Sequence, residues 1–168
     1  MFNYIFYMRD IAERLIDIQH TSALPRFHRV SGIASLEELI VAMGHTTGYQ
    51  LVVEDNLTGR FSDNLSQNFL NNQLFSFYML KQADASVADD LQAVRSGCLT
   101  VAKKILSKIK TDRLTDHRRQ TTNGLRNLDT ANIRYSSVGA IGDHYYGIQV
   151  FFNVVDPAGI IYDEDDWI

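Results

Sequence analysis

The stretch that decides the fold is Tyr146-Gly147-Ile148-Gln149-Val150-Phe151-Phe152-Asn153-Val154. Apolar side chains at the even positions alternate with odd positions that are mostly small or polar. This period of two is typical of a strand that lays one face on an apolar core. The pattern therefore places Phe152 on the buried face with Ile148, Val150 and Val154, and it places Asn153 on the opposite face with Gln149 and Phe151.

Three more strands are predicted on working outward from this one. Residues 74–80, Leu-Phe-Ser-Phe-Tyr-Met-Leu, are apolar on both faces, as expected of a central strand that is covered twice. Residues 49–55 form a second candidate, and residues 133–138 form a third. The glycines of Gly139-Ala140-Ile141-Gly142 predict a hairpin turn before the deciding strand.

Two main helices are predicted from apolar residues that recur at steps of three and four. The first spans about residues 2–19, and the second spans about residues 86–110. Ser35-Leu36-Glu37-Glu38 has the form of a capping box, so a short helix is expected from there to about Gly44. Residues 56–72 and 111–129 show little periodicity and are predicted to be long irregular segments.

This order of elements predicts an α+β fold with a mostly antiparallel sheet of about four strands. The two main helices are expected to cover one face, in the order helix, strand, strand, helix, strand, strand. We expect one domain over residues 1–168, with a helical N-terminal part (1–48), a sheet with its long helix (49–157) and an acidic tail (158–168).

Charge is distributed unevenly along the 168 residues, whose formal net charge is -4. Nine basic and two acidic residues lie between Arg95 and Arg126, a local charge of +7, whereas the last thirteen residues carry five acids and no base. Such a split can steer partners. One explanation of this uneven charge is a solvated helix face together with an acidic tail. The alternative is that the basic segment contacts an acidic partner, nucleic acid or the acidic tail of a neighbouring copy. Non-specific proximity to DNA stays open on this ground.

Sequence motifs of catalysis and cofactor binding are absent. No serine lies in G-x-S-x-G, no phosphate-binding G-x-x-x-x-G-K-[ST] occurs, and the five histidines are scattered. The single Cys98 cannot complete a thiolate metal site, and the acidic tail lacks the spaced ligands of a calcium loop. We therefore expect no enzyme, no cofactor and no metal. The apolar start closes at Arg9, and no apolar run is long enough to cross a bilayer, so neither a signal peptide nor a membrane contact is expected.

Aromatic residues outside the predicted core suggest an interaction surface. Phe2, Tyr4, Phe6 and Tyr7 crowd all sides of the first helical turns, although a helix on a sheet needs only one apolar stripe. They are either anchors buried within the subunit or part of a subunit interface, where aromatics are enriched. The residues that we single out as interface candidates are Phe2, Tyr4, Phe6, Arg118, Arg119 and Trp167.

Three stretches resemble a family of small prophage structural proteins of the Bacteroidetes type. They are Tyr49–Asp55 with Gly59–Asn64, Phe75–Leu80, and Ile133–Tyr135 with Val138–Gly147, followed by the closing Asp156-Pro157-Ala158-Gly159-Ile160. The order of elements is also similar to that of the tail-terminator and head-to-tail connector proteins of tailed bacteriophages. That resemblance implies a ring, commonly a hexamer, which contacts the tail tube and the head connector. It also implies a virion protein that is made in the cytoplasm of a bacterial host.

Two other functions remain open at this stage. One is a different phage neck or tail protein, such as a completion protein or an adaptor. The other is a small ligand-binding or hydrolytic domain whose site forms only in three dimensions.

Overall fold

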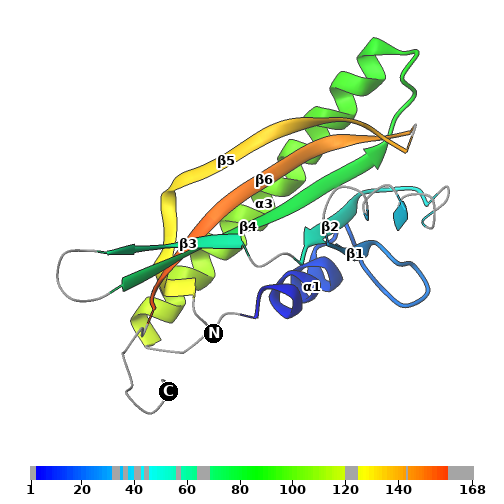
Figure 1. Ribbon diagram of the computed structural model, residues 1–168. Helices are drawn as coiled ribbons and strands as arrows, with labels where there is room; N and C mark the ends of the chain where they lie inside the picture. The colour runs from blue at the N-terminus through cyan, green and yellow to red at the C-terminus, as the bar shows by residue number, and fades with distance from the viewer. Residues whose placement is uncertain are drawn as a thin grey trace, which may run out of the picture.

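The computed structural model describes residues 3–31, 35, 38–39, 43, 46–55, 58–63, 69–119, 125–142 and 144–158, without the side chains of 116–119 and 126. A long helix lies diagonally behind a twisted sheet, and a shorter helix lies beside it (Figure 1). The elements, in chain order, are α1 (Tyr4–Arg14), β1 (Phe27–Val30), β2 (Gln50–Glu54), β3 (Thr58–Asp63), β4 (Phe69–Gln82), α3 (Ala88–Arg119), a 3-10 turn η1 (Leu125–Asn127), β5 (Leu128–Ile141) and β6 (Tyr145–Pro157).

The sheet has six strands and is mixed, so the expected sheet of about four strands is wrong. The expected order helix, strand, strand, helix, strand, strand is wrong too, because four strands, β1 to β4, lie between α1 and α3. The order of the strands in the sheet is β1-β2-β4-β6-β5, and β3 also pairs with β4. β1 is parallel to β2, and the other pairs are antiparallel. β2 and β3 follow one another along the same side of β4, since Val53 pairs with Phe77 and Thr58 pairs with Leu74. They lie end to end beside β4, an arrangement that periodicity does not reveal.

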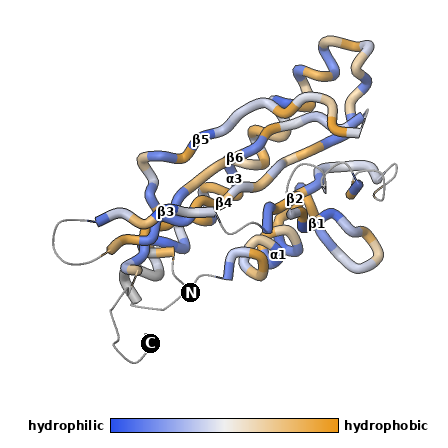
Figure 2. The backbone as a smooth tube through the Cα atoms, viewed as in Figure 1, coloured by the Kyte–Doolittle hydropathy of each residue, from blue (hydrophilic) through white to orange (hydrophobic). Residues whose placement is uncertain are grey.

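One face of the sheet carries the main core, beneath α1 and α3. Hydrophobic residues, orange in Figure 2, recur along α1, α3 and the central strands. The even residues of β6 from Tyr146 to Val154 belong to it, and Phe152 is only 1% exposed. The predicted register of the deciding strand is therefore confirmed. α3 contributes six buried residues to this core: Val94, Cys98, Val101, Ala102, Ile105 and Ile109.

The opposite face is covered over the half that lies near the β5–β6 turn. A second apolar cluster there is built from Val30, Val52, Tyr78, Leu80, Ile141 and Tyr145, with Leu39 and Met43 packed against it. Ser35, Glu38, Leu39 and Met43 are helical, and the rest of the expected short helix lies outside the described residues. The other half of this face, near the start of β4, exposes its side chains and forms the site described below.

The two segments expected to be irregular contain regular structure. Residues 58–63 are β3 and residue 69 begins β4, so the irregular reading of 56–72 is wrong there. β3 is an edge strand with exposed side chains, which removes the apolar alternation that marks a half-buried strand. Residues 111–119 extend α3, because no Gly or Pro lies between Gly97 and Arg119 to stop the helix. Lys108 and Asp112 add an ion pair at i,i+4 spacing.

Helix α1 is shorter than the predicted 2–19. It begins at Tyr4 after the cap Asn3, whose side chain accepts a hydrogen bond from the Phe6 backbone N–H, and it ends at Arg14. Ile18 lies beyond the helix yet is fully buried, so its apolar side chain anchors the following turn. Over the described residues, no helix combines the length and apolarity required to cross a membrane.

Candidate functional site: an open groove on the sheet

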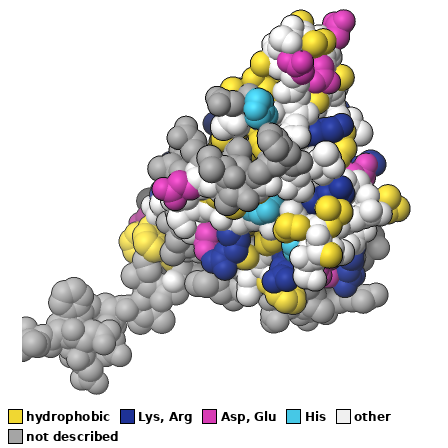
Figure 3. Space-filling model, turned by 90° about the vertical axis from the view of Figure 1, so that its right-hand side faces the viewer, with side chains coloured by type: hydrophobic (Ala, Val, Ile, Leu, Met, Phe, Trp, Pro, Cys, Tyr) yellow, Lys and Arg dark blue, Asp and Glu magenta, His cyan; other side chains and the backbone are white. Residues whose placement is uncertain are grey.

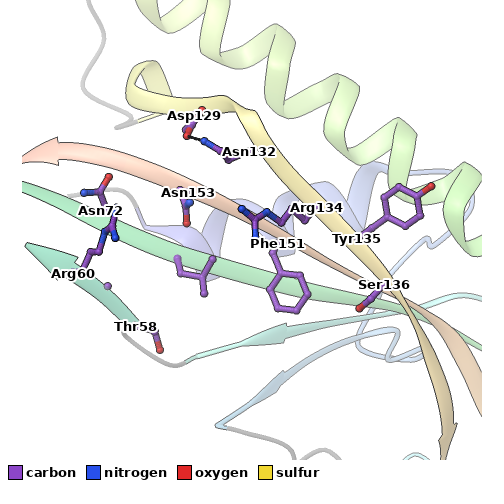
Figure 4. Close-up of a pocket in the computed structure, with 12 residues that line it drawn as sticks. Thr58, Arg60, Asn72, Asp129, Asn132, Arg134, Tyr135, Ser136, Phe151 and Asn153 are labelled. Atoms are coloured by element: carbon purple, nitrogen blue, oxygen red, sulfur yellow. Dashed lines mark hydrogen bonds between the residues drawn. The ribbon is translucent and has the colours of Figure 1, made fainter. Parts of the chain in front are cut away.

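A groove of about 840 Å³ occupies the half of the sheet's opposite face that no described element covers (Figure 4). Four neighbouring strands supply its floor in one register, because Thr58 pairs with Leu74, Leu74 with Asn153, and Asn153 with Asp129. A second row joins Phe151 to Arg134. The lining residues are Thr58, Gly59, Arg60, Asn72, Leu74, Asp129, Asn132, Arg134, Tyr135, Ser136, Phe151 and Asn153.

Positive charge dominates the groove. Arg60 on β3 and Arg134 on β5 are exposed, and neither has an ion-pair partner among the described residues. The single acid, Asp129, accepts hydrogen bonds from the Asn132 side chain and the Ala131 backbone N–H. These bonds lower the pKa of Asp129 below its ordinary value, so its charge is already held within the β5 bend. Leu74 and Phe151 add apolar surface between the two arginines.

A polar network borders the groove on the same face of the sheet. Tyr78 donates from its hydroxyl to Glu54 Oε1 at 2.6 Å, and Ser76 Oγ donates to the other carboxylate oxygen. Gln149 Nε2 donates to the Tyr78 hydroxyl at 2.8 Å. Burial and the bond to Glu54 raise the pKa of Tyr78, which keeps it neutral at physiological pH.

These hydrogen bonds connect β2, β4 and β6, and they do not activate Ser76 as a nucleophile. Ser76 is 3% exposed and donates its proton to the carboxylate, so a substrate cannot reach its oxygen. No cluster of three His, Cys, Asp or Glu side chains that could hold a metal occurs in the part of the chain that the structure describes. Cys98 lies in the core, and burial raises the pKa of its thiol to about 12.

Of the predicted interface residues, the structure describes the side chains of Tyr4 and Phe6. Tyr4 is 5% exposed and packs its ring against Phe75 and Phe152, so the core of the subunit occupies it. Phe6 is 72% exposed on α1 and stays an interface candidate. Arg118 and Arg119 lie in the last turn of α3, and the structure describes only their backbone. Phe2 and Trp167 lie outside the described residues.

Part of the basic segment is already paired within the subunit. Lys104 Nζ lies 2.8 Å from Asp17 Oδ2, joining α3 to the turn after α1, and Lys108 is paired with Asp112. Lys and Arg side chains are interspersed with other types on the side of the molecule shown in Figure 3. Proximity to DNA stays a prediction.

Besides β1, which pairs only with β2, two edges of the described sheet offer unpaired backbone groups. The six-residue strand β3 pairs only with β4, and β5 pairs only with β6. Each edge carries an exposed aromatic side chain, Phe61 at 62% and Tyr135 at 63%. Phe61 pairs with Asn71 and Tyr135 with Val150, which puts both rings on the helix-bearing face. Sequence reasoning missed Phe61 as an edge residue because β3 was read as irregular.

In the comparisons with known proteins, no family model, no curated protein and no solved structure matches the chain.

Proposed function

We propose that this chain is a non-enzymatic assembly subunit that closes into a ring, as phage tail-terminator proteins do. The observation that carries the proposal is the pair of unlike sheet edges, β3 and β5, on opposite sides of one sheet. An exposed edge is a template for a strand of another chain. When an edge of one copy meets a different edge of the next, the contact is heterologous and repeats until the ring closes.

The aromatic side chains strengthen this reading of the edges. Phe61 and Tyr135 lie on the same face of the sheet, so pairing β3 of one copy with β5 of the next would bring the two rings onto one continuous surface. Cross-strand aromatic pairs stabilise such a junction by roughly 0.2–1 kcal/mol each. The long helix α3 would then lie on one side of the ring wall, and the open groove on the other.

The more specific part of the proposal places this ring at the head–tail junction of a phage, and it is supported by the sequence stretches that resemble prophage structural proteins. A protein at that position acts through geometry, since the wedge angle of the subunit sets the ring order. The tail tube and the head connector are the proposed neighbours, and the virion is the proposed location.

Native mass spectrometry with negative-stain imaging tests the proposal. We expect a closed oligomer with a central hole, and we expect Phe61→Lys and Tyr135→Lys each to reduce it to smaller species. Ile16→Lys is the control, because Ile16 is an exposed apolar residue outside both edges. A wild-type protein that stays monomeric at high concentration, or an oligomer unaffected by both edge variants, would contradict the proposal.

The groove favours a second candidate, a ligand-binding module. Its volume suits a small molecule or a peptide segment, and its two arginines favour an anionic ligand. Its lining holds one titratable acid and no histidine or cysteine, which supports binding rather than hydrolysis. Titration calorimetry of the monomer with a series of small anions tests this candidate. Binding of an anion would favour a ligand-binding module, and the absence of binding would favour the ring subunit.

A further inference from the structure

The open groove has features that select its occupant. It joins two exposed guanidinium groups, Arg60 and Arg134, to an apolar surface formed by Leu74 and Phe151. Among the other described arginines, Arg9, Arg14 and Arg29 each have a carboxylate partner, whereas Arg26, Arg95 and Arg113 form no ion pair with a described residue. A suitable occupant is an extended segment that carries several acids and some large apolar side chains.

The C-terminal segment of this chain has that composition. Residues 159–168 read Gly-Ile-Ile-Tyr-Asp-Glu-Asp-Asp-Trp-Ile, with four consecutive acids from Asp163 to Asp166 and no base. Apolar and aromatic side chains flank the acids on both sides. The segment therefore complements the groove in charge and in apolar surface.

The segment also starts in the right place. β6 ends at Pro157, and the Ala158 backbone N–H donates to the Phe69 carbonyl at 2.8 Å, which fixes the exit of the chain beside the start of β4. From this point the groove extends along β6 toward the start of that strand. A strand rises roughly 3.3 Å per residue, so Asn153 lies about 17 Å from Ala158 and Phe151 about 23 Å from it. Pro157 and Gly159 are residues that favour a reversal of the chain.

A reversed segment brings its acids level with Arg134, whereas Arg60 lies nearer the chain exit, because its partner Asn72 pairs with Val155. Asp163 to Asp166 lie five to eight residues after Ala158, a reach of roughly 17–26 Å in extended form. This span covers the positions of Asn153 and Phe151, and Phe151 pairs with Arg134. Trp167, nine residues after Ala158, comes level with Gln149, whose partner Ser136 lines the groove.

We propose that residues 159–168 dock along the groove of their own chain, with the acids against Arg134, the residues before them beside Arg60, and Trp167 near Ser136. A short tether gives the segment an effective concentration of roughly millimolar order at the groove, so weak contacts suffice. This docking needs no second copy. It therefore stands or falls independently of the proposed ring, whose test is the oligomeric state.

Trp167 is the single tryptophan of the sequence, so its fluorescence in the full-length protein reports on the segment alone. We expect shielded emission that is blue-shifted relative to free tryptophan and that red-shifts as salt is raised to about 1 M, because screening weakens exposed ion pairs. In Arg60→Gln/Arg134→Gln, the acrylamide quenching constant should rise about twofold, since each lost pair removes a modest interaction. The matched control is Arg9→Gln/Arg14→Gln, which removes two exposed charges from α1 on the other face.

Three results would overturn the docking. Wild-type Trp167 that is quenched as readily as free tryptophan would leave the groove open to another partner. Shielding that survives both salt and the groove variant would place the segment elsewhere. Shielding that is lost on dilution from about 100 μM to 0.1 μM would assign the groove to the tail of a second copy. The salt titration uses the wild-type chain, so the test holds even if the double variant folds poorly.

Discussion

Phe152 and Asn153 are neighbours on β6 with opposite surroundings. Phe152 is in the core, where its ring lies 5.7 Å from that of Phe75 and 5.9 Å from that of Tyr4, centroid to centroid. Asn153 lies half-buried on the floor of the groove. Phe152→Ala should lower the free energy of unfolding by about 3–5 kcal/mol through lost burial and a cavity. Asn153→Ala should change it by only about 0.5 kcal/mol. Thermal melts of the two variants check this, and a larger loss for Asn153→Ala would reject the assigned faces.

His28 makes stability depend on pH. Its Nε2 lies 3.2 Å from Gln50 Oε1, and burial lowers the pKa of the imidazole despite that hydrogen bond. The unfolded chain, with a histidine pKa of about 6.5, therefore binds the proton more readily than the folded chain. The stabilising effect of neutral His28 is present above that pH and is lost as the pH falls below it.

Urea denaturation at pH about 7.5 and about 5.5 tests the effect of His28. We expect the wild type to lose more stability on acidification than His28→Gln does. An equal loss in both proteins would show that His28 does not contribute to the pH dependence.

At the scale of elements, Gly147 fixes how closely β6 approaches β4. A Cβ atom at Gly147 would lie 1.9 Å from the Met79 carbonyl oxygen, which is backbone and cannot rotate away. Gly147→Ala must separate the two central strands and should cost about 1–3 kcal/mol. Gly139→Ala on β5 is the matched control, because nothing lies within 4 Å of a Cβ there. Equal melting temperatures for the two variants would be inconsistent with this packing.

The elements that the sequence predicts best are those with one buried face. The register of β6 and the apolar run of β4 follow from side-chain patterns that burial imposes. β3 and the last turns of α3 are held by backbone pairing and by polar contacts such as the 2.8 Å hydrogen bond from Tyr7 to Asp112. Such contacts produce no periodic pattern of apolar residues, so the sequence does not predict β3 or the last turns of α3.

The groove could be predicted only in part for the same reason. The outward face of β6, with Gln149, Phe151 and Asn153, follows from the alternation. Arg60 and Arg134 are brought to that face by the pairing of β3 with β4 and of β5 with β6, and strand order across a sheet is not encoded in local patterns. The fold expected with the resemblance to phage proteins is wrong in the number and order of the strands and lacks the parallel β1–β2 pair.

At the scale of the whole molecule, the central claim is that unlike edges of the sheet join one copy to the next. In a heterologous contact, Tyr135→Lys keeps an intact β3 edge and Phe61→Lys keeps an intact β5 edge. Each variant alone therefore lacks a complete junction, whereas a mixture of the two can form one good junction per pair. A symmetric contact between like edges would not give this complementation.

Native mass spectrometry of the two variants, separately and mixed at equal concentration, is the measurement that tests this claim most directly. We predict monomers for each variant alone and a mixed dimer containing one copy of each after mixing, while Ile16→Lys behaves as the wild type. Dimers of a single variant, or a mixture that contains only monomers although the wild type assembles, would contradict pairing between β3 and β5.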